Sequence, residues 1–222
     1  MKGEASAAHR LRAGRRGLIV GLGALLLSGC GAIPGLGPAP NFYDLPPKTT
    51  FSSSLPKVNW QLDIPEPLAD GALDTDRIPL KTSPIEIKYF ADSRWVDRIP
   101  SLVQTLMVES FENSGKIVGV GRESSDLRAD YSLISELRQF QAEYIENDKI
   151  PTIRVQLNVK LVREPRQDII AFRTFEDRYM AKAGDIQSVV LAFNEAINKV
   201  LREVVEWTLT TAPPVPPRQS VQ

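Results

Sequence analysis

The chain has 222 residues, of which 42% are hydrophobic and 24% are charged, and its 27 basic residues balance its 27 acidic ones. This composition is typical of a globular protein and excludes a chain that is disordered throughout. The only histidine is His9 and the only cysteine is Cys30. If residues 1–29 are removed on export, the mature chain has no histidine, which excludes Ser-His-Asp and Cys-His catalysis and the usual zinc ligands.

The first 30 residues have the pattern of a secretory leader. Lys2 and four arginines precede the apolar run Gly17–Leu27, which is followed by Ser28, Gly29 and Cys30. The run has 11 residues, whereas a membrane-spanning helix needs roughly 20, so the run is too short for a transmembrane anchor. We therefore predict a signal peptide over residues 1–29.

The residues Leu27-Ser-Gly-Cys30 resemble the lipobox of bacterial lipoproteins. The resemblance implies cleavage between Gly29 and Cys30, a diacylglycerol on the Cys30 sulfur, and a further acyl chain such as palmitate on the new amino group. Two or more acyl chains make membrane attachment lasting. The alternative is an ordinary leader with Cys30 as an incidental thiol. Because Gly31 rather than aspartate follows the cysteine, the analogy favours the outer membrane, with the protein facing the periplasm.

Proline and glycine are concentrated at the start of the mature chain. The segment Gly31–Pro40 has no apolar period, and we predict that residues 30–56 are the lipidated cysteine and a flexible spacer. At the other end, Ala212-Pro-Pro-Val-Pro-Pro217 ends the last helix, so residues 212–222 are predicted to be a proline-rich tail. The folded domain is then predicted to span residues 57–211.

Alternation of apolar and polar residues predicts six strands within that domain. The clearest is Thr152–Leu161, where five aliphatic residues alternate with Arg154, Gln156, Asn158 and Lys160. The others are 60–64, 85–89, 117–120, 130–137 and 168–175. The polar face of Thr152–Leu161 is either solvent-exposed or a contact between subunits of a homo-oligomer.

Helical spacing of apolar residues predicts two helices. The first runs from about Asp97 to Ser114 and ends at Gly115, and the second is capped by Asp185 and runs to about Leu209. The apolar stripe of the second helix, which ends at Trp207, either packs on the sheet or lines a lipid-carrying groove. The order of the elements predicts an α+β fold, with a mainly antiparallel sheet and two long helices packed on one face.

A series of short blocks in the folded part is similar to the ABC-type transport auxiliary lipoproteins. These blocks follow the lipobox in order between about Asn59 and Leu209: Leu73–Ile78, Tyr89–Pro100, Ser114-Gly115, Ala129–Tyr131, Leu137–Phe140 and Ala192-Phe193 through Trp207. The resemblance implies a non-catalytic outer-membrane component of a lipid transport system. Its implied partners are an ABC permease, an ATPase and a mammalian-cell-entry substrate-binding protein.

Four residues in the matching blocks are candidate partner contacts: Trp95, Asp97, Asp130 and Tyr131. For the first pair the alternative is that Trp95 fills the core while Asp97 caps the first helix or pairs with Arg94. For Asp130 and Tyr131 the alternative is structural: Asp130 is a polar residue at the start of a strand, and the Tyr131 ring is buried.

We expect no cofactor, no metal and no nucleic acid as partners. Asp70, Asp74 and Asp76 lie close together, but their segment lacks the glycine and terminal glutamate of a calcium loop. Gly119-Val-Gly121 lacks the third glycine of a dinucleotide-binding motif. The leader holds five basic residues and one acidic residue, so the mature chain has four more acidic than basic residues and no basic footprint. The rival functions are a lipoprotein that itself holds a lipid or plugs an outer-membrane assembly, and a hydrolase that uses carboxylates alone.

Overall fold

The computed structural model describes residues 39–122, 128–145 and 147–216, and one compact unit begins at Pro40. The predicted signal peptide, its cleavage site at Gly29 and Cys30, and most of the predicted spacer lie outside the described residues.

Three long strands form one side of the sheet: β7 (Tyr131–Glu143), β8 (Thr152–Arg163) and the edge strand β9 (Asp168–Met180). They pair in chain order, and both pairings are antiparallel. In β8 the five alternating aliphatic side chains are all fully buried, while its polar side chains are half-buried or exposed. The strand predicted from this alternation is therefore confirmed.

On the edge of β7 opposite β8, three short strands pair with β7. Each is parallel to β7 and pairs with a different part of it. These are β2 (Gln61–Asp63), β3 (Leu68–Ala69) and β4 (Arg77–Ser83). Three further strands extend the sheet: β5 (Glu86–Trp95), antiparallel to β4; β1 (Asn41–Tyr43), parallel to β5; and β6 (Gly119–Gly121), parallel to β2. The sheet thus has nine strands and mixed pairing, although its long pairings are antiparallel.

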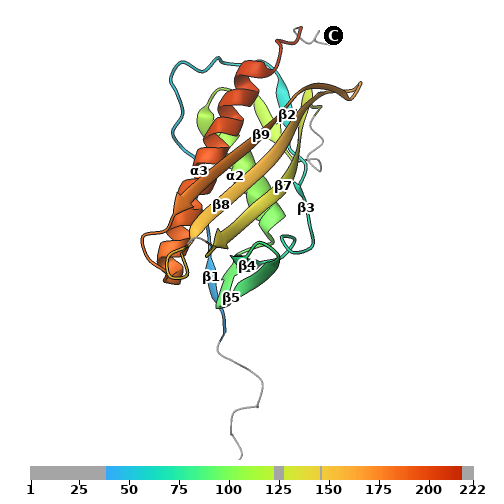
Figure 1. The fold of residues 1–222 in the computed structure, drawn as a ribbon. Helices are drawn as coiled ribbons and strands as arrows, with labels where there is room; N and C mark the ends of the chain where they lie inside the picture. Colours follow the sequence, from blue (N-terminus) through green and yellow to red (C-terminus); the bar gives the residue numbers. More distant parts are fainter. Residues whose placement is uncertain (1–38, 123–127, 146, 217–222) are drawn as a thin grey trace, which may run out of the picture. The chain divides into compact units, whose positions relative to one another are not determined.

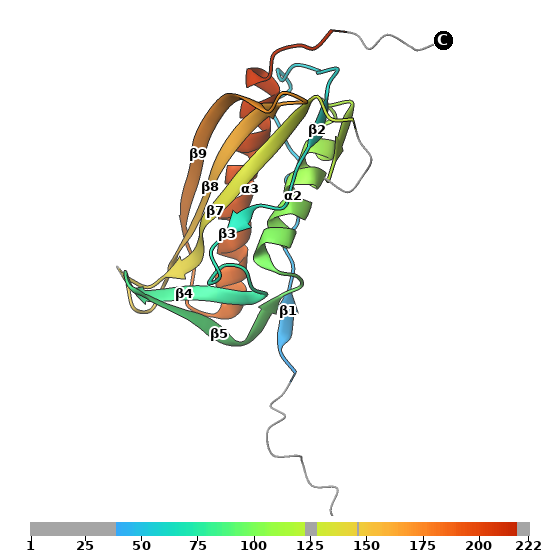
Figure 2. The same cartoon turned by 90° about the vertical axis from the view of Figure 1, so that its right-hand side faces the viewer.

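Two helices, α2 (Ile99–Ser114) and α3 (Ile186–Thr211), lie on the same side of the β7–β9 layer (Figures 1 and 2). Helix α2 ends at Gly115, whose φ of 60° is left-handed and therefore suits glycine. Helix α3 begins after Asp185, whose side chain accepts a hydrogen bond from Ser188 N at 2.9 Å. These helix ends and the α+β fold agree with the prediction.

The core fills the space between the helices and the sheet. The rings of Trp95, Phe140 and Phe193 contact one another there, with centroid separations between 4.9 and 5.8 Å. All three side chains are fully buried. Because Trp95 belongs to β5, Phe140 to β7 and Phe193 to α3, one aromatic cluster joins these three elements.

The folded unit begins earlier in the chain than the prediction of residue 57. Residues 41–43 form β1, and Leu45 and Leu55 are buried in the core. The sequence does not reveal these contacts. The segment is rich in proline, β1 is only three residues long, and the buried leucines follow no regular period. The part of the predicted spacer from Pro40 onward is therefore folded.

The first residues of the proline-rich tail also pack on the folded unit. Helix α3 ends at Thr211, and after it Ala212 and Val215 lie against the core. Tyr131 Oη donates a hydrogen bond to Pro213 O at 2.7 Å, and Asn59 Nδ2 donates to Val215 O at 3.4 Å.

Candidate functional site

The four candidate contact residues do not form one site. Trp95 lies in the aromatic cluster with no exposed surface, which favours its alternative role in the core. Asp97 is exposed beside the first turn of α2 and accepts hydrogen bonds from Ser101 Oγ and Arg98 N, both at 2.6 Å. The Ser101 hydrogen bond is the main cause of a lowered Asp97 pKa. Arg94 pairs with Asp76 at 2.7 Å and not with Asp97.

Asp130 and Tyr131 hold strand β2 and the tail in place. Asp130 Oδ2 accepts a hydrogen bond from Gln61 N at 2.8 Å. The Tyr131 ring is buried and meets Trp60 edge-on at 5.3 Å. Their contacts favour the structural alternative, a polar strand start with a buried ring.

Two of the three clustered aspartates, Asp74 and Asp76, form ion pairs with arginines. Asp74 and Glu66 both contact the Arg98 guanidinium, and Asp76 pairs with Arg94. Within the described residues no group of three or more His, Cys, Asp or Glu side chains is placed to hold a metal ion.

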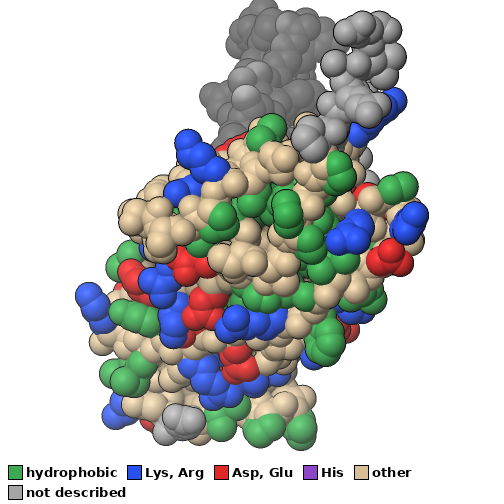
Figure 3. All heavy atoms as spheres, turned by 90° about the horizontal axis from the view of Figure 1, so that it is seen from above, with side chains coloured by type: hydrophobic (Ala, Val, Ile, Leu, Met, Phe, Trp, Pro, Cys, Tyr) green, Lys and Arg blue, Asp and Glu red, His purple; other side chains and the backbone are tan. Residues whose placement is uncertain are grey.

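The sheet leaves one face uncovered by helices, formed by the side chains of β7–β9 that point away from α2 and α3. We call it the open face. Along β8 it carries the side chains of Thr152, Arg154, Gln156, Asn158 and Lys160. At the upper end of the unit, which Figure 3 shows, basic, acidic and hydrophobic side chains are intermixed and do not gather into one continuous charged area.

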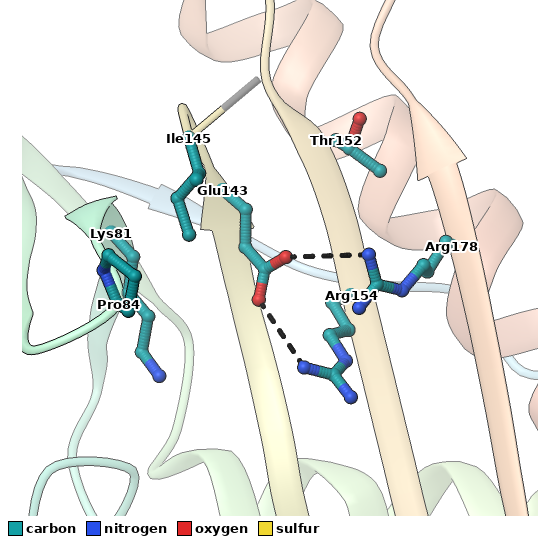
Figure 4. Close-up of a pocket in the computed structure, with 7 residues that line it drawn as sticks. All are labelled: Lys81, Pro84, Glu143, Ile145, Thr152, Arg154 and Arg178. Carbon is teal, nitrogen blue, oxygen red and sulfur yellow. Dashed lines mark ion pairs between the residues drawn. The ribbon is translucent and has the colours of Figure 1, made fainter. Parts of the chain in front are cut away.

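A depression of about 250 Å³ lies at one end of the open face (Figure 4). Seven residues line it, and we call it the Glu143 pocket: Lys81, Pro84, Glu143, Ile145, Thr152, Arg154 and Arg178. They come from β4, β7, β8, β9 and two adjoining turns. The pocket forms because Lys81 is paired with Glu143, which in turn is paired with Thr152.

Glu143 faces two guanidinium groups, as Figure 4 shows. Its Oε1 is 3.8 Å from Arg154 Nη1 and its Oε2 is 4.0 Å from Arg178 Nη1. Its side chain is only 11% exposed, and Gln141 Nε2 donates to its Oε1 at 2.9 Å. The carboxylate is thus held in place by an amide and faced by two cations that it does not closely contact.

A second carboxylate, Glu176, positions the same two arginines from the side. Its Oε1 accepts from Arg154 Nε at 2.8 Å and from Arg178 Nε at 3.3 Å. These contacts, led by the Arg154 hydrogen bond, lower the Glu176 pKa. Because Glu176 binds the Nε atoms, the Nη atoms of both arginines remain directed toward the pocket.

This arrangement is suited to binding rather than to bond-making. The guanidinium groups and the Lys81 ammonium offer several cationic hydrogen-bond donors and no acceptor. Sequence reasoning did not identify the pocket, because Lys81, Glu143, Arg154 and Arg178 lie far apart in the chain. The signal in the sequence was Arg154, one of two charged residues on the polar face of the predicted strand 152–161.

Neither helix of the described residues combines the length and apolarity that crossing a bilayer requires.

Comparison with known proteins gives a consistent result. The family model for the ABC-type transport auxiliary lipoprotein component matches residues 43–205. An uncharacterized protein of Bradyrhizobium diazoefficiens is 31% identical over 171 residues; the match covers 75% of this chain but only 44% of that longer protein. The crystal structure of protein XCC0632 from Xanthomonas campestris superposes with a TM-score of 0.73 at 31% identity, covering 77% of this chain and 95% of that one. A second crystal structure, of an uncharacterized protein, has a TM-score of 0.56 at 14% identity over 75% of this chain and 97% of its own, which shows a shared fold.

Proposed function

Because this chain belongs to the ABC-type transport auxiliary lipoprotein family, we propose that it is a non-catalytic lipoprotein that docks other components of an ABC-type lipid transport system. The family match over residues 43–205 is the observation that carries the proposal. In this proposal Cys30 is lipidated and holds the protein at the outer membrane, facing the periplasm. The partner that it docks is a mammalian-cell-entry substrate-binding protein, which is served by an ABC permease and ATPase.

The position of the folded unit along the chain supports a short tether. The unit begins at Pro40, ten residues after Cys30. A chain segment of that length spans at most about 35 Å even when fully extended. A partner docked on the folded unit would therefore be kept close to the membrane surface.

The build of the folded unit supports a scaffold role. One sheet face is covered by two helices, and the other face is left open. The open face offers a broad surface on rigid strands, and surfaces on strands hold their geometry better than surfaces on loops.

The apolar stripe of α3 favours this role over a lipid-carrying groove on the helix. Val189, Phe193, Ile197, Val200 and Val204 are buried against the sheet, with at most 1% of each exposed. Trp207, at the end of the stripe, meets Phe175 edge-on at 5.5 Å. The side chains of the stripe therefore pack within the folded unit and do not line a groove for lipid.

The anchor is tested by Cys30→Ser in the full-length chain. Removing the thiol removes the acceptor for the diacylglycerol, so we expect an unprocessed or released protein that no longer fractionates with outer membranes. Ser28→Ala is the matched control, because it keeps a small residue before the cleavage site and keeps Cys30. Normal processing and outer-membrane fractionation of Cys30→Ser would contradict the proposal.

The partner is tested by purifying the tagged full-length protein from its own membranes. We expect the substrate-binding protein of the transport system to co-purify. Deletion of the gene should alter outer-membrane permeability while ATP hydrolysis by the isolated permease complex stays unchanged. Normal permeability together with the absence of the substrate-binding protein from the eluate would contradict docking.

A further inference from the structure

We propose that the Glu143 pocket binds a phosphate group, either as free phosphate or as part of a lipid headgroup. Three cationic side chains face this pocket: Lys81, Arg154 and Arg178.

The pocket holds cationic hydrogen-bond donors that its own carboxylate does not satisfy. The distances from Glu143 to Arg154 Nη1 and Arg178 Nη1, 3.8 and 4.0 Å, are too long for hydrogen bonds. Lys81 has no acidic partner within ion-pair distance among the described residues. An acceptor seated in the pocket could therefore gain short charge-assisted hydrogen bonds from these cations without first breaking a hydrogen bond between an arginine and Glu143.

The charges of the lining favour an anion. Lys81, Arg154 and Arg178 supply three positive charges, and Glu143 supplies the one negative charge of the lining. Glu176 stands outside the lining and is engaged with the Nε atoms of the two arginines and with Gln156. It holds the guanidinium groups in place and leaves their outer edges for a ligand.

The placement of the cations favours phosphate over carboxylate. The three side chains come from three strands: Lys81 from β4, Arg154 from β8 and Arg178 from β9. In Figure 4 Lys81 lies on one side of Glu143 and the two arginines lie on the other. A phosphate presents its oxygens in several directions and can accept from all three cations, whereas a carboxylate presents two oxygens in one plane.

The size and rim of the pocket set the kind of molecule that could carry the phosphate. A volume of about 250 Å³ is below the roughly 300–1,000 Å³ of sites that enclose whole small molecules, so a headgroup fits and a complete lipid does not. One apolar side chain of the lining, Ile145, is 45% exposed, and two exposed apolar side chains neighbour lining residues: Ile85 follows Pro84 in the chain and is 98% exposed, and Met180 is paired with Thr152 and is 63% exposed. These side chains could contact the apolar part of an amphiphile. The lipid source rests on the proposed transport function, whereas phosphate binding itself does not.

The test is isothermal titration calorimetry of the full-length protein in a non-ionic detergent, with two probes. One probe is inorganic phosphate and the other is dihexanoylphosphatidylglycerol. The variants are Lys81→Gln, which removes a cation without a protein partner, and Arg178→Gln. Lys160→Gln is the matched control, because it removes a cation from the open face outside the pocket.

We expect each pocket variant to weaken phosphate binding about tenfold, as the loss of one charge-assisted hydrogen bond implies, and Lys160→Gln to change it less than about twofold. Tighter binding of the short-chain lipid than of phosphate, lost in Lys81→Gln, assigns a lipid headgroup as the source. Equal binding of the two probes assigns free phosphate.

Absence of binding at millimolar phosphate and lipid, or wild-type affinity in Lys81→Gln, would overturn the proposal. Should Arg178→Gln fail to fold, Lys81→Gln still decides the question. Because the titration needs no membrane attachment, its result is independent of the fate of Cys30→Ser.

Discussion

The two faces of the β7–β9 sheet are built by the same strands and stabilised in different ways. On the helix-facing side, the odd-numbered residues of β8 from Ile153 to Leu161 are fully buried under α3. On the open face, the residues between them form polar contacts such as Asn158 Nδ2 to Thr174 Oγ1 at 3.0 Å. Close packing stabilises the helix-facing side, whereas the open face is stabilised by polar contacts between side chains that are also accessible to water.

This difference indicates how the protein can combine stability with binding. Buried packing contributes most of the free energy of unfolding, so the helix-facing side leaves little freedom to change. Exposed polar pairs contribute little each, so the residues of the open face can be selected for their contacts with ligands or partners. Substitutions on the two faces should therefore differ in their effect on stability.

The largest effect is expected from two neighbouring residues of β8 that point to opposite faces. Leu157→Ala removes a fully buried side chain between Leu137 and Phe175, and we expect it to lower the free energy of unfolding by about 2–5 kcal/mol. Asn158→Ala is the matched variant and should change it by no more than about 0.5 kcal/mol. Urea denaturation of both variants measures the difference. Equal losses would show that the two faces are not distinct.

An intermediate effect is expected where an ion pair lies at the border of the helix-facing side. Lys199 Nζ on α3 contacts Asp177 Oδ1 on β9, and the Asp177 side chain is only 7% exposed. Lys199→Ala leaves that carboxylate without its cation, and we expect a loss of about 1–2 kcal/mol at pH 7. Lys182→Ala, at an exposed position, serves as the charge-matched control.

The pH dependence of this pair has a defined sign. The Asp177 hydrogen bond is the main cause of a raised Lys199 pKa, so the pair stabilises the fold fully below the usual lysine pKa of about 10.4. The advantage of wild type over Lys199→Ala should therefore shrink as the pH rises through the raised pKa. A constant difference from pH 7 to 11 would contradict this account.

The smallest effect is expected on the open face, at Glu176. Its pKa is lowered, chiefly by Arg154, so its contribution is present above the usual glutamate pKa of about 4.3 and is lost as the pH falls through the lowered value. Glu176→Gln should cost about 1 kcal/mol or less at pH 7, because the side chain is 31% exposed, and this cost should shrink as the pH falls through the lowered pKa. Glu136→Gln, whose glutamate contacts one arginine instead of two, should show a smaller change when both are followed by thermal unfolding.

The sequence predicted the parts of the fold in which local pattern and burial agree. Strand 152–161 and the helix from Asp185 were predicted because each has one buried face with a regular period. Strand β7 runs to Glu143, whereas the predicted strand ended at Leu137. The prediction stopped early because an irregularity between Leu137 and Gln139 shifts the alternation of buried and exposed residues. Strands β1 and β3 have three and two residues, too few to show any period.

The parallel pairings and the Glu143 pocket could not be predicted in this way. Whether β2, β3 and β4 lie along the same edge of β7 depends on how the chain returns after each strand, and no short pattern specifies this. The pocket likewise needs the register of β4 with β7 and of β7 with β8 before Lys81 and Arg154 face the same space. Lipidation at Cys30 follows from a local motif and stays a prediction.

The attachment of the tail at Pro213 and Val215 affects where the protein can be shortened or fused. A truncation at Thr211 would retain all of α3 and yet deprive the Tyr131 hydroxyl of its acceptor and Asn59 of its contact with Val215. Engineered versions should keep the chain through Pro216 and place any purification handle beyond that residue.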